Sequence, residues 1–286
     1  MTNTLKFLGY DERPAFAPPV RAYHDRCVAM ASGVEGTEHS YGSHPLQRLT
    51  VYPAAQPSGE VLLVFHGGRF SHGYKEWMAI MAPALHRRGV TLVSAAYRLI
   101  PEPFPAGLQD CGAALHWVHA NLRIFGGARD AIFIGGHSSG GYYATMVALR
   151  PQKVGLGQVP AVAGCISISG LYRMEADKLP GPLLFPDGAE PQTYVDASPV
   201  LQDLRAAPAF HISWASNDLP PVPEQSAEMV SALSRAGVPA ESLVVQGADH
   251  FSINFAASES DGTWMNSVEP FIKRHRAARA GTPAAS

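Results

Sequence analysis

Short apolar runs alternate with longer segments of helical periodicity along most of this 286-residue chain, and this alternation constrains the fold more than any other feature. It predicts a mostly parallel sheet with helices on both faces, an α/β architecture. Residues 61–65, Val-Leu-Leu-Val-Phe, are apolar throughout, as in strands buried on both sides. The expected strands are 47–52, 61–65, 91–96, 131–134, 161–167, 209–214 and 242–245, and the expected helices are 77–88, 106–125, 140–150, 224–236 and 261–275.

The most informative motif lies where one expected strand meets the next expected helix. Residues 136–140 read Gly-His-Ser-Ser-Gly there. A Gly-x-Ser-x-Gly turn between a strand and a helix is typical of a nucleophile elbow, in which a sharp turn exposes the central serine. Gly136 and Gly140 lack Cβ atoms, so the strand and the helix can approach closely around Ser138. Ser138 is therefore the candidate nucleophile.

A serine hydroxyl needs a base to take its proton, and the base needs an acid that orients it. His250 is the candidate base because it follows the apolar run 243–245 at the C-terminal end of an expected strand. Active sites of open parallel sheets gather at that end. Asp218 is the candidate acid because it follows the apolar run 210–214 in the same way.

Three other carboxylates are weaker candidates for the acid. Asp249 is adjacent to His250 in the chain and is expected to point away from its imidazole. Glu224 falls in the first turn of an expected helix, where a carboxylate favours the helix dipole. Asp203 precedes its strand and so lies at the wrong end of the sheet.

Acyl transfer also needs hydrogen-bond donors aimed at the developing oxyanion. Residues 66–70, His-Gly-Gly-Arg-Phe, follow directly on an expected strand and resemble the His-Gly-Gly-x oxyanion loops of lipases and esterases. The backbone amides of Gly67 and Gly68, together with that of Ser139 at the start of the next helix, form the candidate oxyanion hole. An ordinary turn would be the alternative if Ser138 were absent.

The composition argues against several function classes. The chain is 46% hydrophobic and 16% charged, with a net charge of −2 and no block of like charge, so neither a nucleic-acid partner nor a membrane-surface patch is expected. Its 3 cysteines are widely separated, as in reduced cytosolic proteins. Apolar runs fall short of the roughly 20 residues that span a bilayer, and no secretory signal is visible. A cytoplasmic protein without membrane insertion is expected, and its oligomeric state is left open.

No metal or cofactor is expected either. His116 and His119 lie three residues apart on an expected helix, but no third ligand of suitable spacing accompanies them. The glycine-rich loops that cradle nucleotide phosphates have no counterpart in the chain.

The chain is expected to form a single domain, because it shows neither repeats nor a linker. Residues 1–45 are expected to form an N-terminal arm or partial cap, and residues 277–286 a frayed tail. Residues 171–205 are longer than a typical connection and rich in proline, glycine and acidic residues. They are expected to be a lid insertion over the active-site end, with an ordered surface loop as the alternative.

Together these motifs identify a family resemblance. The His-Gly-Gly loop, the segment 97–106 (Tyr-Arg-Leu-Ile-Pro-Glu-Pro-Phe-Pro-Ala), the elbow at 136–141 and the settings of Asp218 and His250 resemble the hormone-sensitive-lipase-like branch of the α/β-hydrolase superfamily. The resemblance covers roughly residues 45–275. It implies the α/β-hydrolase fold and a serine esterase with a Ser-Asp-His triad.

A finer resemblance joins residues 10–14, 41–45 and 249–251 to arylformamidase (kynurenine formamidase) and its esterase relatives. Two positions depart from the family patterns. Arg69 replaces a third glycine and is expected either to recognise a substrate anion or to lie in solvent or pair with an acid. Phe70 replaces a tryptophan and is expected to line an acyl or aryl pocket with Tyr142, for which core packing is the alternative.

The sequence therefore predicts a serine hydrolase that cleaves carboxylic esters of small to medium acyl or aryl substrates through an acyl-enzyme on Ser138. An arylformamidase-type amidase acting on N-formylkynurenine or a similar formanilide is the alternative. A non-catalytic ligand-binding protein, like the plant gibberellin receptors that resemble this branch, is a remote third. That route usually loses the catalytic histidine, whereas His250 is present.

Overall fold

The structure, a computed structural model, describes residues 16–150, 154–185 and 187–280. Residues 10–14, which carry part of the formamidase resemblance, lie outside the described residues. The same holds for residues 281–286 of the expected tail. The single-domain organisation stays a prediction.

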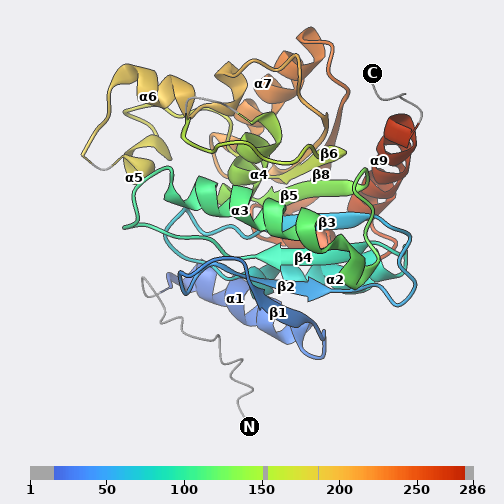
Figure 1. Cartoon of the computed structure of the whole chain (residues 1–286). Coiled ribbons are helices and arrows are strands. Elements are labelled where there is room, and N and C mark those ends of the chain that lie inside the picture. Colours follow the sequence, from blue (N-terminus) through green and yellow to red (C-terminus); the bar gives the residue numbers. More distant parts are fainter. Residues whose placement is uncertain (1–15, 151–153, 186, 281–286) are drawn as a thin grey trace.

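An eight-stranded sheet forms the centre of the molecule, in the order β1-β2-β4-β3-β5-β6-β7-β8 (Figure 1). Neighbouring strands from β4 to β8 pair in parallel, whereas β1 with β2 and β2 with β4 pair antiparallel. The predicted mostly parallel sheet is thus confirmed. The strands are β1 (Thr37–Ser40), β2 (Arg48–Tyr52), β3 (Val61–Phe65), β4 (Thr91–Ala95), β5 (Ile132–His137), β6 (Gly164–Ile168), β7 (Ala209–Asn217) and β8 (Ala240–Asp249).

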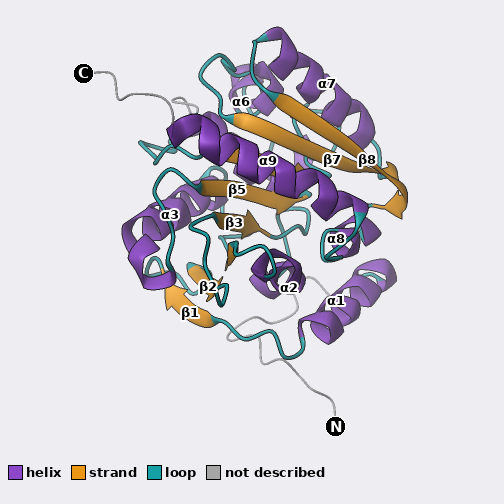
Figure 2. Cartoon of the chain, turned by 90° about the vertical axis from the view of Figure 1, so that its right-hand side faces the viewer, coloured by secondary structure: helices purple, strands orange, loops and turns teal. Residues whose placement is uncertain are grey.

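Helices cover both faces of the sheet, as the alternation predicts (Figures 1 and 2). In β3, Val61, Leu63 and Phe65 pack into the core beneath α3, α4 and α7, whereas Leu62 and Val64 pack into the core beneath α2, α8 and α9. Successive side chains of a strand point to opposite faces, so a strand between two cores is apolar throughout.

Among the described residues, no helix has the length and apolar character needed to cross a membrane. The α-helices are α1 (Pro18–Ala31), α2 (Ala82–His86), α3 (Ala106–Asn121), α4 (Ser139–Leu149), α5 (Gly181–Leu184), α6 (Pro191–Asp196), α7 (Val222–Arg235), α8 (Ser252–Ala256) and α9 (Thr263–Ala280), and the 3-10 helices named here are η1 (Lys75–Met81), η2 (Leu122–Phe125) and η4 (Pro199–Leu201).

Several elements differ from the sequence expectations: helices α1, α5, α6 and α8 were not among the expected helices, and two further differences have a clear physical reason. The helix expected at 77–88 is divided into the 3-10 helix η1 and the short helix α2, with Pro83 at the start of α2. Proline has no N–H to donate and its ring clashes with the preceding turn, so one continuous α-helix is disfavoured there. Strand β1 was not expected at all, because its sequence Thr-Glu-His-Ser is polar and half-exposed at the edge of the sheet.

The described part of the expected N-terminal arm is integrated with the sheet. Its strand β1 extends the sheet, and its helix α1 packs beside η1. Two hydrogen bonds fix α1: the indole of Trp77 donates to His24 Nδ1 over 3.0 Å, and the amide of Asn254 donates to the Tyr23 hydroxyl over 2.8 Å. Helix α1 is therefore held against both η1 and α8.

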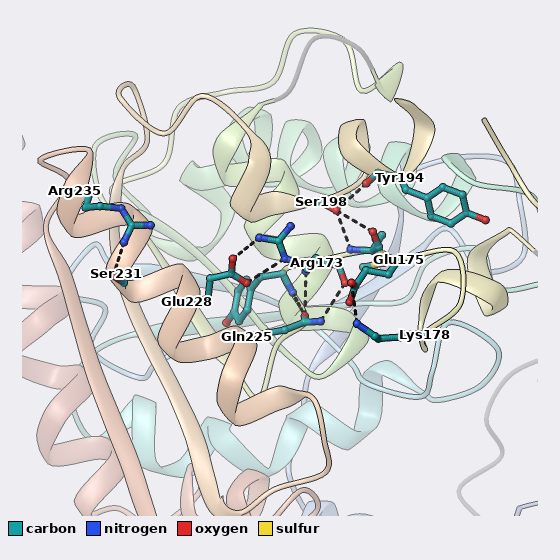
Figure 3. A network of polar contacts seen from close by, with 11 residues as sticks. Arg173, Glu175, Lys178, Tyr194, Ser198, Gln225, Glu228, Ser231 and Arg235 are labelled. Atoms are coloured by element: carbon teal, nitrogen blue, oxygen red, sulfur yellow. Dashed lines mark hydrogen bonds and ion pairs between the residues drawn. The ribbon is translucent and has the colours of Figure 1, made fainter. Parts of the chain in front are cut away.

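The segment 171–205 contains α5, α6 and η4, and polar contacts fasten its beginning to α7 (Figure 3). The buried side-chain oxygen of Gln225 accepts the backbone N–H groups of Tyr172 (2.8 Å) and Arg173 (3.0 Å). The Arg173 guanidinium pairs with Glu228. Farther along, Ser198 Oγ accepts the amide of Met174 over 2.8 Å, which ties the two ends of the segment together. A lid role for this segment stays a prediction.

Candidate active site

Ser138 occupies a strained turn between β5 and α4. Its φ and ψ angles are 56° and −120°, a conformation that residues other than glycine rarely adopt. The turn is tight because a Cβ atom at Gly140 would lie 2.1 Å from the carbonyl oxygen of Phe65. A Cβ atom at Gly136 would lie 2.5 Å from the backbone of Gly140. Both flanking glycines are thus required for the close approach that the motif predicts.

Strands β7 and β8 extend beyond their apolar runs, and their ends bring Asp218 and His250 to Ser138. The hydroxyl of Ser138 lies 2.9 Å from His250 Nε2. The other ring nitrogen of His250, Nδ1, lies 2.6 Å from Asp218 Oδ1. Since the carboxylate accepts the Nδ1 proton, Nε2 is left to accept the serine proton. Three residues chosen on sequence grounds therefore form one hydrogen-bonded chain.

Asp218 is held as an ion by several donors. Its side chain is fully buried, and burial by itself raises the pKa of a carboxyl group. Opposing this, the hydrogen bond and charge of His250, with donors from Ser169 Oγ (2.5 Å) and the Ala215 amide (3.0 Å), bring the pKa of Asp218 below its ordinary value. The amide of Leu219 donates to Oδ1 as well, over 2.9 Å. The carboxylate is thus ready to orient an imidazole.

The other carboxylates that the sequence offers have other partners. Asp249 accepts the backbone N–H groups of Phe251 (3.1 Å) and Ser252 (2.7 Å) at the start of α8. Asp203 pairs with its neighbour Arg205. Glu224 lies in the first turn of α7, as expected. Asp218 alone among these four is hydrogen-bonded to His250 in the described chain.

The candidate oxyanion loop lies directly against the nucleophile. A Cβ atom at Gly67 would lie 3.1 Å from the Cβ of Ser138, and one at Gly68, whose φ is 129°, would lie 1.9 Å from the His72 carbonyl oxygen. His66 braces the loop: its ring stacks on that of Tyr97 with centroids 4.5 Å apart. The oxyanion-hole roles of Gly67, Gly68 and the Ser139 amide stay predictions.

The three candidate pocket residues lie in different surroundings. Arg69 is exposed, and Phe70 is buried with its ring edge-on to Tyr142 at 5.5 Å; both have positive φ angles, 54° and 65°. Tyr142 is fully buried, and its hydroxyl donates to the carbonyl of Ala197 over 2.9 Å. Tyr142 therefore joins the elbow helix to the segment 171–205. A direct contact with substrate stays a prediction for all three.

Sequence reasoning missed two residues that contact the triad. Ser169, with φ of 48°, is buried after β6 and donates to Asp218. His137 lies beside His250, and its Nε2 is 2.7 Å from the His250 carbonyl oxygen. A serine after an apolar strand is too common to signal such a role. For His137, the one available signal in the sequence was a titratable side chain directly before the candidate nucleophile.

Removing the Ser169 hydroxyl should lower kcat about tenfold, because a hydrogen bond to a buried charge contributes about 1.5–3 kcal/mol. Its loss also moves the pKa of Asp218 upward. Ser169→Ala and Ser169→Gly should be equally slow in ester hydrolysis, whereas only glycine suits the positive φ and should preserve thermal stability better. Unchanged kcat in both variants would show that this bond does not support the acid.

The stability of the fold should decrease below neutral pH because burial depresses the pKa of His66, His137 and His211. Burial lowers the pKa of His66 to about 4, of His137 to about 3 and of His211 to about 4. The unfolded chain therefore binds more protons than the folded chain between about pH 4 and 6.5, and stability is lost as pH falls through that window. Each histidine should contribute about 1–2 kcal/mol of loss by about pH 5.

Urea unfolding at about pH 7.5 and about pH 5 measures this loss. The His211→Gln variant keeps a hydrogen-bond donor for its neighbour Ser267 but cannot titrate, so it should lose less stability on acidification. A wild-type free energy of unfolding that is equal at the two pH values would contradict the expectation.

Comparisons with known proteins agree with this geometry. The profile of a family described as alpha/beta hydrolase fold matches residues 62–254. Esterase LipC of Mycobacterium tuberculosis is 27% identical to this chain over 84% of the chain. The match spans 65% of the length of LipC, just under two thirds. Kynurenine formamidase of Danio rerio is 27% identical to this chain, and the match covers 74% of this chain and 73% of the length of that relative. Among solved structures, Bacterial Heroin Esterase superposes on this chain with a TM-score of 0.72 at 24% sequence identity. The superposition covers 90% of this chain and 91% of the esterase chain.

Proposed function

Because this chain belongs to the alpha/beta hydrolase fold family, we propose that it hydrolyses carboxylic esters of small to medium acyl or aryl substrates through an acyl-enzyme on Ser138. The observation that carries the proposal is the continuous hydrogen-bonded chain from Ser138 Oγ through the His250 ring to Asp218. A base and an orienting acid at these distances are what a serine hydroxyl needs to become a nucleophile.

In this mechanism Ser138 Oγ attacks the carbonyl carbon of the ester while His250 Nε2 takes the hydroxyl proton. Asp218 stabilises the imidazolium that results. The carbonyl oxygen becomes an oxyanion and accepts hydrogen bonds from the amides of Gly67, Gly68 and Ser139. Collapse of the tetrahedral intermediate expels the alcohol, which takes the proton from His250.

The acyl-enzyme is then hydrolysed by the same groups. Water adds to the acyl carbon as His250 removes its proton, and the second tetrahedral intermediate releases the carboxylic acid and restores the Ser138 hydroxyl. Every proton in this cycle passes through His250, and the catalytic groups are side chains and backbone amides of this chain.

Several observations support an ester as substrate. LipC and Bacterial Heroin Esterase are esterases by name and resemble this chain over most of its length. Phe70 follows directly on the oxyanion loop, and edge-on contacts with Tyr142 and Tyr143, at 5.5 and 5.4 Å, hold its buried ring, so that it would form a fixed apolar backing behind an acyl or aryl group. The exposed guanidinium of Arg69 adds a positive charge beside this loop, which favours acyl or aryl groups that carry an anion.

An arylformamidase-type amidase is the second candidate, and the match to kynurenine formamidase over about three quarters of both chains favours it. A formanilide carbonyl would take the place of the ester carbonyl in the same steps. The two candidates differ in the leaving group: an alcohol leaves in one and an arylamine in the other.

Rates on a panel of p-nitrophenyl esters from acetyl to octanoyl, compared with the rate on N-formylkynurenine, test the proposal. We expect kcat/KM for the best ester to exceed that for N-formylkynurenine by about tenfold or more. The opposite ranking would favour the formamidase. Wild-type protein that turns over neither class would overturn both and favour a ligand-binding role.

A further inference from the structure

His137 lies at the end of β5, between the oxyanion loop and the loop that carries His250. Its Nε2 is 2.7 Å from the backbone carbonyl oxygen of His250, and the two imidazole rings are 4.9 Å apart and tilted by 42°. We propose that His137 is a positioning residue that holds the His250 loop and ring in register with Ser138. This inference rests on the proposed function, because it concerns the same proton transfer.

The hydrogen-bonding partners of His137 determine its tautomer. A backbone carbonyl only accepts, so the bond to His250 requires a proton on His137 Nε2. The other ring nitrogen, Nδ1, is buried and has no hydrogen-bond partner among the described residues. A second proton on Nδ1 would therefore be buried without an acceptor, which is costly. His137 thus stays neutral and keeps its single proton on the nitrogen that faces the His250 carbonyl.

The neutral state suits the proposed reaction. Each cycle passes through an imidazolium on His250, and a second positive charge about 5 Å away would oppose its formation in a low-dielectric interior. Burial, followed by repulsion from His250, lowers the pKa of His137 to about 3. The ring beside the base therefore contributes a dipole and a hydrogen bond without contributing charge.

The same ring also supports the oxyanion loop. A Cβ atom at Gly67 would lie 2.9 Å from His137 Nδ1, so the imidazole occupies the space directly beneath this glycine. Because one rigid side chain contacts both loops and precedes Ser138 in the chain, a shift of His137 would move the base and the oxyanion donors relative to the nucleophile.

Helix α1 also packs against the His250 loop. The ring of Tyr23 lies 5.3 Å from Phe251 and 6.2 Å from His137, and its hydroxyl accepts the Asn254 amide. The His250 loop is therefore held both by packing against α1 and by the hydrogen bond from His137. Only the latter acts on the residue that carries the base.

Glutamine and methionine form a matched pair of substitutions at this position, since both are unbranched and of similar length and only glutamine has an N–H near the place of Nε2. We expect His137→Met to lower kcat on p-nitrophenyl butyrate by about 10- to 100-fold, with KM changed less than about threefold. A small displacement of the catalytic base lowers the reaction rate by about this factor without weakening substrate binding. His137→Gln should restore kcat to within about fivefold of wild type. His137→Met at about wild-type kcat, or His137→Gln as slow as a folded His137→Met, would overturn the proposal.

Nitrogen-15 NMR of the histidines in the wild-type protein gives a second readout that needs no folded variant. The expected result is a neutral His137 with its proton on Nε2 at about pH 6 to 8. A proton on Nδ1, or a charged ring in that range, would contradict the proposal. Wild-type protein without ester or formamide turnover would instead refute the proposed function. The NMR result would then still test whether His137 donates a hydrogen bond to the His250 carbonyl.

Discussion

Replacing Ser138 by alanine should lower kcat for the best ester by about 10⁴- to 10⁶-fold, because no other hydroxyl is placed on His250 Nε2 in the described chain. The substitution removes the nucleophile and leaves the binding groups and the oxyanion loop in place. The remaining rate should be that of water attacking a bound ester. Measurement of kcat and KM with p-nitrophenyl butyrate, on protein free of contaminating esterase, gives the ratio.

The fold should tolerate this change. Alanine adopts the strained φ of 56° at about the same cost as serine, and the Ser138 amide still donates to the Ile168 carbonyl over 2.8 Å. Ser231→Ala, which removes an exposed serine on α7, serves as the matched control and should leave kcat unchanged. If Ser138→Ala retained activity within about tenfold of wild type, Ser138 would not be the nucleophile.

Replacing Asp218 by asparagine should lower kcat by about 10³- to 10⁴-fold, the cost of presenting the wrong tautomer of the base. Asp218 Oδ2 accepts from Ser169 Oγ and the Ala215 amide, so the single oxygen of asparagine is held at that position. The amide nitrogen then takes the place of Oδ1 and faces His250 Nδ1. A donor there favours the tautomer with its proton on Nε2, which cannot accept the proton of Ser138.

The neighbouring carboxylate provides the matched control. Asp249 precedes His250 directly, yet its carboxylate binds the start of α8 instead of the imidazole. Asp249→Asn should therefore keep kcat within about threefold of wild type. Comparison of kcat for the two variants assigns the acid: a large loss in Asp249→Asn with little loss in Asp218→Asn would reverse the assignment.

Most of the sheet could be predicted because its central strands β3, β4, β5 and β6 are buried on both faces. Val61–Phe65 is apolar throughout and forms β3 with the predicted bounds. The glycines of the elbow could also be interpreted from sequence, because the close approach of Gly140 to the Phe65 carbonyl leaves no room for a side chain. Such steric demands act over a few residues and leave a local signature.

Long-range polar contacts leave no comparable signature. Ser169 reaches Asp218 across 49 positions of the chain, and His137 reaches the His250 carbonyl across 113. A serine or a histidine alone does not reveal which atom it will face, because that depends on strand order and on the irregular ends of β6 and β8. Strand β1 escaped prediction for another reason: an edge strand exposed to solvent does not need alternating apolar residues.

The most direct test of the central claim is to identify the residue that reacts with an organophosphate ester. Wild-type protein treated with diethyl p-nitrophenyl phosphate should lose activity in proportion to the incorporation of one diethylphosphoryl group, and peptide mass spectrometry should locate that group on Ser138. Addition of the group to another residue, or full esterase activity after stoichiometric modification of Ser138, would contradict the account.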